Sequence, residues 1–515
     1  VFVLTGQQMG YLQPCGCSEP QIGGLERRYN LVQQMKEAGW RVVPLDTGDV
    51  PQAKGPAGLR NLQALIKYRY AMRAMNEIGY KGVAYGELEA GLGMFDIHGE
   101  YWLNDAEPRG VMSNHIDGHK NFPDMAKPWW YVDVKEAEMR VGIAAIVGPT
   151  VAARIKEVTG NNPKMRFSET KATLKDIAAQ MGKGGVAFPV LLWQGPVSRD
   201  ALVKEKTEAM RAAEEFPQFP LVVALADEDE PAFRPTMVGR TMVVAPGRKG
   251  KYVAAVGVWK TGDAKKPFEL KYERVEITPD FVTPAEKVKG HPIAKLMEDY
   301  TAELKSADYL GKYGQDKHAL QAMAPVKGLR NPGNAEYAGS EACMKCHEHA
   351  WDVWKKVDDK GRGHSVAYQT LVDARKPGNR HHDPECIVCH TVGFGYQTGY
   401  RSEPGYPAWV ERQVKAGEKI DPKKHQHGLK DVGCESCHGP SSLHVRNPDD
   451  KEWQKRINPW RHQFPGKANE AKKNHAIDQM CQKCHDIDND VHWIGGGFAK
   501  KWPKVEHYTP AAKDE

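Results

Sequence analysis

The sequence predicts two domains of different fold class, an α/β domain followed by a mainly α domain. Its 515 residues are too many for one compact core. Apolar runs and amphipathic helical stretches alternate over residues 1–285. After residue 340 the pattern changes, because 8 of the 10 cysteines and 15 of the 20 histidines lie there. We therefore expect the chemistry of the chain in its last third.

The α/β prediction begins with alternation in the first hundred residues. Residues 1–6 form a continuous apolar run, and in residues 23–39 apolar side chains recur at helical spacing until Gly39. Residues 40–49 are typical of a second strand. A second helix has its apolar side over residues 62–75, and residues 81–91 are typical of a strand and turn. This order predicts a covered sheet with functional loops at the strand ends.

Three later apolar runs continue the α/β pattern. They are residues 188–196, 219–231 and 241–260, and the last is expected to form a hairpin-like antiparallel end. A long helix is predicted to start near Pro292, before a crossing rich in Pro and Gly. The expected organisation is an α/β domain at 1–285, a helical linker at 286–334 and a second domain at 335–515.

Charge and hydropathy argue against two classes of protein. Lys and Arg number 72 against 66 Asp and Glu, and the net charge of +6 is spread along the chain. Nucleic-acid binding is therefore not expected. No apolar run approaches the roughly 20 residues that span a bilayer. The sequence opens directly on an apolar strand, so we expect that a signal peptide has been removed or left out.

Four copies of the motif C-x-x-C-H carry the chemistry of the second domain. Two thiols at this spacing reach the two vinyl groups of one heme, and the histidine that follows is its proximal iron ligand. A tetrahedral zinc site would need a different arrangement of Cys and His pairs. The sequence thus predicts four covalently attached hemes c. The attachment cysteines are Cys343, Cys346, Cys386, Cys389, Cys434, Cys437, Cys481 and Cys484, and the proximal histidines are His347, His390, His438 and His485.

Each iron has a sixth position that a second histidine can fill. Eleven further histidines follow residue 340. Ligation by two histidines favours electron transfer, because the iron keeps its coordination when its oxidation state changes. An open position would instead admit a small molecule such as NO, nitrite or hydroxylamine, and the residues alone leave both possibilities open. The hemes themselves are expected to form much of the apolar interior of this domain.

The region from residue 335 to 515 resembles the tetraheme cytochrome c-554 family. The order and spacing of the motifs, the stretch CESCHGPSSLH and the pair W-x-x-W followed by GHS-x-A carry the resemblance. It implies an electron carrier that serves redox partner proteins, in the periplasm or another extracytoplasmic compartment. It also implies a second heme with His390 as its only protein ligand. The candidates for distal iron ligands are His349, His364, His444 and His507.

The first domain resembles the calcineurin-like metallophosphoesterase fold of the 5'-nucleotidase family, a four-layer α/β sandwich. That family holds two metal ions on loops after successive strands. Landmarks such as GGLERR persist in this chain, but every imidazole ligand of the family is missing. We therefore do not expect phosphoester hydrolysis, and we expect this domain to dock a partner or bind a ligand. The corresponding positions hold Gln7 and Gln8, Asp49, Glu87 and Leu88, Gln194, and Asp227 and Asp229.

The polar residues that remain in the first domain allow two interpretations. A set of five carboxylates could hold a hard cation through oxygen ligands, or they could simply be solvated. His115 and His119 are either a ligand pair on one helix face or surface side chains on a loop, and the Gly and Asn around them favour the loop. The five carboxylates are Asp49, Glu87, Glu89, Asp227 and Asp229.

Two cysteines near the start of the chain stand apart from the heme motifs. Cys15 and Cys17 have the wrong spacing for heme, and a disulfide across one residue would be strained. They are candidates for an extra, soft metal such as copper or for a redox-active pair, and inert buried thiols are the alternative. The second hypothesis for the chain is therefore a multiheme redox enzyme. It would act on a small nitrogen or sulfur compound at a five-coordinate heme or at this pair.

Overall fold

The structure, a computed structural model, describes residues 1–14, 20–103, 107–121, 126–197, 206–323, 335–374, 377–401 and 428–507. The chain divides into two compact units. The first contains the N-terminal strand, Pro20–Ala53 and Gln63–Met297, and the second contains Lys54–Leu62 and the chain from Glu298 onward. The predicted boundaries at residues 285 and 334 do not coincide with this division. It falls inside a helix and gives a short segment of the N-terminal half to the second unit.

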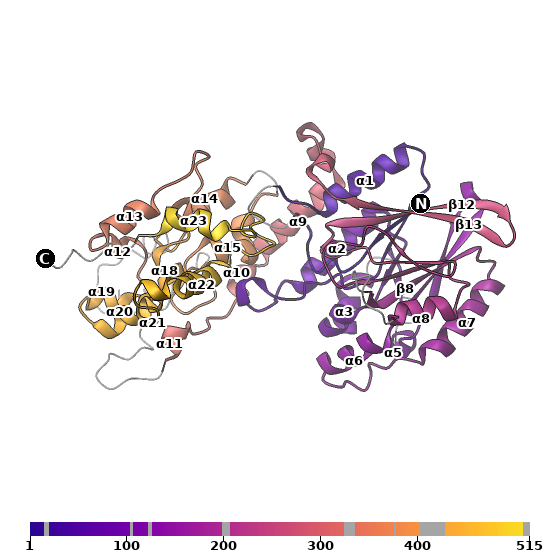
Figure 1. The fold of residues 1–515 in the computed structure, drawn as a ribbon, viewed down its shortest axis with the longest axis horizontal. Helices are drawn as coiled ribbons and strands as arrows, with labels where there is room; N and C mark the ends of the chain where they lie inside the picture. Colours follow the sequence, from indigo (N-terminus) through magenta and orange to yellow (C-terminus); the bar gives the residue numbers. More distant parts are fainter. Residues whose placement is uncertain are drawn as a thin grey trace. The chain divides into compact units, whose positions relative to one another are not determined.

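Two mixed β-sheets form the centre of the first unit (Figure 1). One has seven strands in the order β13-β12-β1-β2-β3-β4-β5, and the other has six in the order β10-β11-β9-β8-β7-β6. Strands β1 to β5 are parallel to one another. The strands are β1 (Phe2–Thr5), β2 (Val43–Asp46), β3 (Gly82–Ala84), β4 (Gly110–Val111), β5 (Ala126–Lys127), β6 (Trp129–Val134), β7 (Met139–Val147), β8 (Phe188–Val197), β9 (Leu221–Ala226), β10 (Thr236–Val238), β11 (Thr241–Val244), β12 (Tyr252–Asp263) and β13 (Lys266–Glu276).

Apolar side chains fill the space between the two sheets. Phe2 and Leu4 of β1 meet Phe188 of β8 and Leu221 of β9 in one buried cluster. The rings of Phe2 and Phe188 stack with their centroids 5.4 Å apart. Because side chains alternate along a strand, every second residue of β1 points into this interior. The inner strands β1 and β9 are buried along their whole length, as continuous apolar runs in parallel strands require.

Helices cover the outer faces, which gives the first unit four layers. Ile177 of α7 and Ala212 of α8 pack on the second sheet in another buried cluster. Helices α1 and α2 lie on the side of the first sheet. Helix α2 ends at Gly79, where a φ of 100° allows the backbone N–H of Gly79 to donate to carbonyls of the last helical turn. The predicted α/β sandwich is confirmed. The helices are α1 (Leu25–Glu37), α2 (Ala64–Ile78), α3 (Glu87–Leu92), α4 (Met94–Ile97), α5 (Ile116–Asn121), α6 (Pro149–Val158), α7 (Thr170–Lys183) and α8 (Glu208–Glu215).

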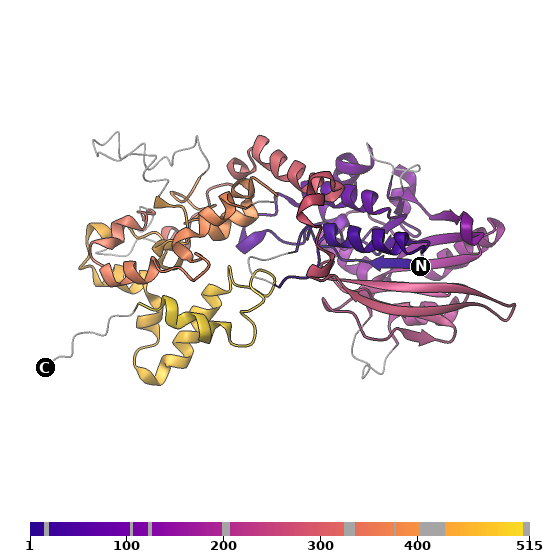
Figure 2. The ribbon, with the colours of Figure 1, turned by 90° about the horizontal axis from the view of Figure 1, so that it is seen from above.

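The predicted hairpin over residues 241–260 is wrong. Strand β11 lies in the second sheet, parallel to β9, whereas β12 lies in the first sheet and pairs with β1. The hairpin partner of β12 is β13, and Figure 2 shows these two long strands running side by side. Two neighbouring strands with glycines between them favour a hairpin locally. The sandwich instead assigns them to different sheets, which is a long-range choice.

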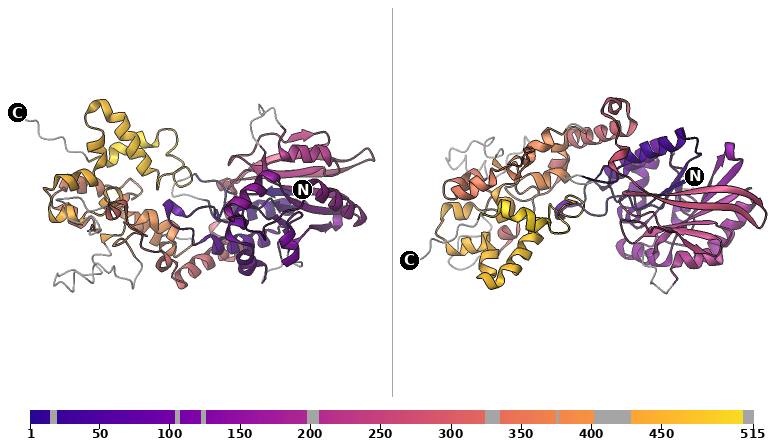
Figure 3. Two further views of the ribbon diagram at one scale, coloured as in Figure 1. Left: turned by 90° about the horizontal axis from the view of Figure 1, so that it is seen from below. Right: turned by 45° about the horizontal axis from the view of Figure 1, so that its top comes forward.

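The second unit consists of short helices with few apolar core residues (Figure 3). Its larger buried cluster includes Tyr313, Tyr337, Ile387 and Phe394, and a smaller one surrounds Trp453. No helix in the described ranges of the chain is long and apolar enough to cross a bilayer. The helices are α9 (Pro292–Ser306), α10 (Tyr309–Lys312), α11 (Ala319–Ala322), α12 (Glu341–Met344), α13 (Glu348–Trp354), α14 (Ala367–Val372), α15 (Pro384–His390), α18 (Cys434–His438), α19 (Ser442–Arg446), α20 (Lys451–Ile457), α21 (Pro459–Gln463), α22 (Glu470–Cys481) and α23 (Gly497–Val505).

Candidate functional site

Each C-x-x-C-H motif lies in or beside a short helix. Helices α15 and α18 end at the motif histidines His390 and His438. Helix α15 begins where the carboxylate of Asp383 accepts the N–H of Glu385 at 2.9 Å, with Pro384 in the first helical position. In a helical turn, side chains three positions apart share a face. Both thiols of a motif can therefore reach one porphyrin.

Three of the four motif histidines face a second imidazole from a distant part of the chain. The ring centroids of His347 and His444 are 6.2 Å apart. Those of His364 and His485 are 6.1 Å apart, as are those of His438 and His507. With metal–nitrogen distances of about 2.0 Å, two imidazoles on opposite sides of one metal have centroids about 6 Å apart. The three centroid distances therefore match the spacing of two imidazoles on one iron.

Hydrogen bonds orient three motif histidines through the ring nitrogen that faces away from a metal. The Nδ1–H of His390 donates to the carbonyl of Ala367 at 2.6 Å, and that of His438 donates to the carbonyl of Ile457 at 2.6 Å. The Nδ1–H of His485 donates to the carboxylate of Asp490 at 2.9 Å. Such bonds fix the tautomer and leave Nε2 as the ligand atom.

Burial favours the neutral form of three of these imidazoles. It lowers the pKa of His364 to about 4, and the neighbouring His485 ring lowers it further. Burial likewise lowers the pKa of His438 and of His444. The neutral imidazole is the form that binds metals. The donor set, the spacing and the charge state all fit covalently attached heme.

The remaining sequence candidates lie apart from these three pairs. His349 is exposed on α13 and belongs to none of them. The centroids of His381 and His382 are 4.4 Å apart, which is too close for opposite ligands of one iron. His425 and His427 lie outside the described residues, and so do Cys15 and Cys17. A site at the cysteine pair therefore stays a prediction, as does an open position opposite His390.

The four motifs adjoin in two pairs. The thiols of Cys343 and Cys434 lie close enough to shift each other's pKa, so the first motif adjoins the third. The thiol of Cys389 likewise lowers the pKa of Cys484, so the second motif adjoins the fourth. Each thiol marks the edge of the macrocycle that its motif would hold. Hemes on adjoining motifs would thus have neighbouring edges.

Glu435, inside the third motif, is a structural residue that the sequence analysis missed. Its buried carboxylate accepts the N–H groups of Ala338 at 2.9 Å, Gly339 at 2.7 Å and Ser441 at 2.8 Å. Burial raises the pKa of Glu435 to about 7. The residue ties the chain just before the first motif to the third motif. An acidic residue between two motif cysteines is the signal that could have found it.

The strand ends of the first unit come together as the phosphoesterase resemblance implied. The backbone N–H of Gln7 donates to the carbonyl of Gly48 at 2.7 Å, and its side-chain oxygen accepts the N–H of Ala226 at 2.8 Å. The side chain of Gln194 donates to the carbonyl of Thr47. The residues that the resemblance places at metal-ligand positions therefore bond to neighbouring strand ends.

A buried guanidinium group lies beside these strand ends. Arg28, from the GGLERR landmark, donates to Gln8 at 2.6 Å and to the hydroxyl of Tyr80 at 3.1 Å. That hydroxyl lies 2.8 Å from Thr5, which donates to Asp46 at 2.5 Å. Burial raises the pKa of Asp46, and the charge of Arg28 opposes this effect. One protein cation and a chain of hydrogen bonds thus support a buried carboxylate.

The five carboxylates proposed for a hard cation have other partners or other surroundings. Glu89 accepts three backbone N–H groups, and Asp49 accepts that of Leu88 at 2.9 Å. Glu87 pairs with Arg154 at 2.6 Å, Asp229 pairs with Arg248, Lys249 and Lys251, and Asp227 is exposed. Nowhere in the described ranges do three or more His, Cys, Asp or Glu side chains converge as metal ligands. The described contacts thus favour structural and surface roles over a cation site.

His115 is buried, so the predicted surface role is wrong. Its ring stacks on Tyr85 with a centroid distance of 5.6 Å and lies 5.1 Å from the ring of Phe167. Residues 116–121 form helix α5, where a loop was expected. Asp117 anchors this helix, since it pairs with Arg166 at 3.0 Å. The side chain of His119 lies outside the described part of the structure.

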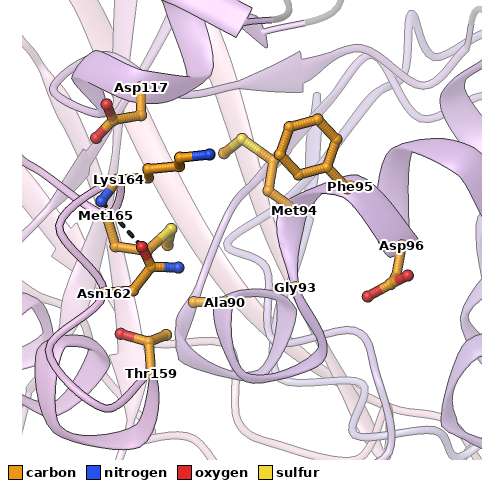
Figure 4. Close-up of a pocket in the computed structure, with 10 residues that line it drawn as sticks. All are labelled: Ala90, Gly93, Met94, Phe95, Asp96, Asp117, Thr159, Asn162, Lys164 and Met165. Carbon is orange, nitrogen blue, oxygen red and sulfur yellow. Dashed lines mark hydrogen bonds between the residues drawn. The ribbon is translucent and has the colours of Figure 1, made fainter.

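A pocket of the first unit lies among α3, α4 and the turn after α6 (Figure 4). Its volume is about 140 Å³, and Met94, Phe95 and Met165 give it an apolar lining. Lys164 and Asp117 lie at one side of it in Figure 4. Pockets for small organic ligands usually measure about 300–1,000 Å³. The pocket is too small for a nucleotide, and none of the sequence-predicted site residues lines it.

Comparison with known proteins supports the cytochrome part of the sequence analysis. Residues 342–439, which contain the first three motifs, match the family model described as cytochrome c554 and c-prime. Cytochrome c-554 of Nitrosomonas europaea is 27% identical over 121 residues. The second unit is similar to cytochrome c-554. The match covers 22% of this chain and 43% of that cytochrome, so the similar region is less than half the length of the relative.

The structure is also similar to solved phosphoesterases. A 5'-nucleotidase precursor from Thermus thermophilus has a TM-score of 0.46 and 18% identity, over 68% of this chain and 66% of the other. A calcineurin-like phosphoesterase from Bacillus subtilis has a TM-score of 0.46 and 15% identity, over 60% of this chain and 98% of the other. Similarity at this level concerns the fold alone.

Proposed function

We propose that this chain is a c-type cytochrome that carries four covalently attached hemes and transfers electrons between redox partner proteins outside the cytoplasm. The observation that carries the proposal is the set of three imidazole pairs. In each pair a motif histidine faces a histidine from another part of the chain at the distance that one iron needs. The axial pairs would be His347 with His444, His485 with His364, and His438 with His507.

The surroundings of these histidines suit electron transfer. Bound heme would supply a reversible one-electron couple, and two imidazoles keep the coordination of the iron constant through it. The hydrogen bonds from His438 and His485 hold the rings in place, so that little reorientation accompanies a change of charge. The adjoining motifs would bring the macrocycle edges close enough to pass electrons within each pair.

The first unit is proposed to serve docking or ligand binding without hydrolysis. A two-metal hydrolase needs ligands that hold both ions and activate a water. At those positions Gln7, Gln8 and Gln194 stand in place of imidazoles, and their contacts are with the protein itself. Asp49 and Glu89 accept backbone N–H groups. A partner protein or a ligand would therefore bind to the first unit without cleavage of a phosphoester.

Heme content and spin state test the proposal. The purified holoprotein is expected to contain four hemes per chain by pyridine hemochrome absorbance and at least three low-spin hemes by EPR. His444→Ala should convert one of them to a high-spin heme. His349→Ala, the matched change of an exposed histidine, should leave the spectrum unchanged. Fewer than three low-spin hemes, or a high-spin heme in His349→Ala alone, would contradict the proposal.

Added NO tests the expectation that the second heme has an open position. If His390 is the only protein ligand of that iron, NO should change the wild-type spectrum without any substitution. The response should persist in His444→Ala, which affects a different heme. A spectrum that NO leaves unchanged would argue against the alternative function, a redox enzyme that acts at this heme.

A further inference from the structure

A segment of nine residues from the N-terminal half of the chain belongs to the second unit. Lys54–Leu62 follows β2 and precedes α2 in the sequence, but it packs with residues around the second heme motif. It includes a short turn at Pro56–Gly58. The region similar to cytochrome c-554 starts almost three hundred residues later, so it does not contain this segment. This part of the second motif's surroundings thus comes from outside the cytochrome sequence.

Leu59 makes the apolar contact of the segment. It packs against the buried cluster that contains Ile387, Val392 and Phe394, and Cys386 and Val388 pack against the same cluster. Ile387 and Val388 are the two residues between the cysteines of the second motif. The approach is close, because a Cβ atom added at Gly395 would lie 2.6 Å from a methyl carbon of Leu59. Leu59 is therefore part of the wall beside the second motif.

Polar contacts flank Leu59 within the same unit. Arg60 pairs with Asp316 at 3.5 Å, and the backbone of Asp316 bonds to Gly395 and Gln397, each at 2.9 Å. The side chains of Arg60 and Asp316 are 67% and 60% exposed, so this ion pair adds little stability by itself. The apolar contact of Leu59 is the one that bears on a heme.

We propose that residues 54–62 are a positioning segment for the second heme, and that Leu59 helps to set the midpoint potential of that heme. The potential of a heme depends on the polarity and water access of the shell around it. Truncation at Leu59 would leave space next to the motif, which water or a collapse of the cluster would fill. The inference rests on the proposed function in one respect, namely that the second motif carries a heme.

A redox titration of the full-length holoprotein tests this inference, with Leu320→Ala as the matched control for Leu59→Ala. Leu320 is also a half-buried leucine on a buried cluster, but its cluster contains Leu443 and Trp453. Leu59→Ala is expected to change one redox equilibrium constant up to about tenfold, which is about 59 mV for a one-electron couple. The other three potentials should stay in place, and Leu320→Ala should leave the shifted component unchanged.

The shifted component is assigned by elimination. His444→Ala, His364→Ala and His507→Ala should each move the potential of one paired heme, so the second heme is the component that none of them moves. Four unchanged potentials in Leu59→Ala with full heme content would overturn the inference, and so would a shift of a paired heme. Leu59→Met, which keeps the apolar volume, should restore the wild-type potential, and a persistent shift would also count against it.

Two further outcomes distinguish a failure of the role proposed for Leu59 from a failure of the proposed function. If Leu59→Ala does not accumulate, Leu59→Val provides a smaller truncation, and a smaller shift of the same component is expected. No shift in that variant would overturn the inference. A wild-type protein with three hemes and an empty second motif would instead contradict the proposed function, because no second heme would exist to be tuned.

Discussion

Eighteen apolar residues form the buried cluster between the sheets of the first unit, whereas the larger described cluster of the second unit has nine. The two units also differ in what their polar residues do. In the first, the positions that correspond to metal ligands bond to the protein itself. In the second, imidazoles face one another across a space that fits an iron. The polar residues of the first unit thus bond within the protein, whereas the histidines of the second unit lie at the spacing that the proposed hemes need.

The contrast between the two cores predicts that the second unit needs heme to fold and that the first unit does not. Replacement of all eight motif cysteines by serine is expected to leave the second unit unfolded and the first unit folded, because the hemes complete only the second interior. Limited proteolysis with mass spectrometry would show cleavage throughout residues 335–507 and protection of the first unit. The wild-type holoprotein is the control. Protection of both units would show that the small clusters suffice.

The buried network of the first unit allows a second test. Arg28→Met should lower the free energy of unfolding of this unit by about 3–5 kcal/mol, because Asp46 stays buried without its cation. The neighbouring Arg27→Met removes a half-buried side chain that donates to the carbonyl of Gln21, and should cost about 1 kcal/mol. Urea denaturation followed by amide exchange in first-unit peptides measures both variants. Equal decreases in the free energy of unfolding in the two variants would show that Arg28 does not stabilise the buried carboxylate of Asp46.

Asp49 and Glu89 predict a smaller effect, which depends on pH. Burial raises the pKa of Asp49 to about 6 and that of Glu89 to about 8, and the charge of Asp49 adds to the rise at Glu89. The native unit therefore keeps protons that the unfolded chain has already released. Its free energy of unfolding should fall as the pH rises from about 4 to 8.

Denaturation at pH 5 and at pH 8 checks this dependence. Asp49→Asn keeps the oxygen that accepts the N–H of Leu88 but removes one of the two charges, so the dependence should flatten. Glu215→Gln, a change of an exposed carboxylate in the same unit, should leave the slope as in the wild type. A free energy of unfolding that rises from pH 5 to pH 8 would contradict the raised pKa values of Asp49 and Glu89.

The sequence predicted those features that local or covalent chemistry determines. Alternating strands and helices predicted the covered α/β sheet, and the C-x-x-C-H spacing predicted His347, His390, His438 and His485 as proximal ligands. The partners of these histidines depend on tertiary contacts. The family resemblance pointed to His364, His444 and His507, whose ring centroids lie 6.1–6.2 Å from those of motif histidines. It also pointed to His349, which belongs to none of these three pairs.

Other features had no usable sequence signal. GGLERR was visible as a landmark, but nothing local shows that Arg28 is buried or that it reaches Gln8 and Tyr80. The burial of His115 depends on Tyr85 and Phe167, which come from separate stretches of the chain. Sheet membership of β11 and β12 was likewise decided at long range. Patterns along the chain identify elements, and the choice of their neighbours needs the fold.

The excursion of residues 54–62 also bears on how such a chain can arise and be divided. The polypeptide leaves the first unit, contributes to the second, and returns to complete the first. The two units therefore cannot be separated by one cut in the chain, because a single cut would leave Leu59 on the fragment that contains the first unit. Moving the second unit to another scaffold would therefore require moving residues 54–62 with it.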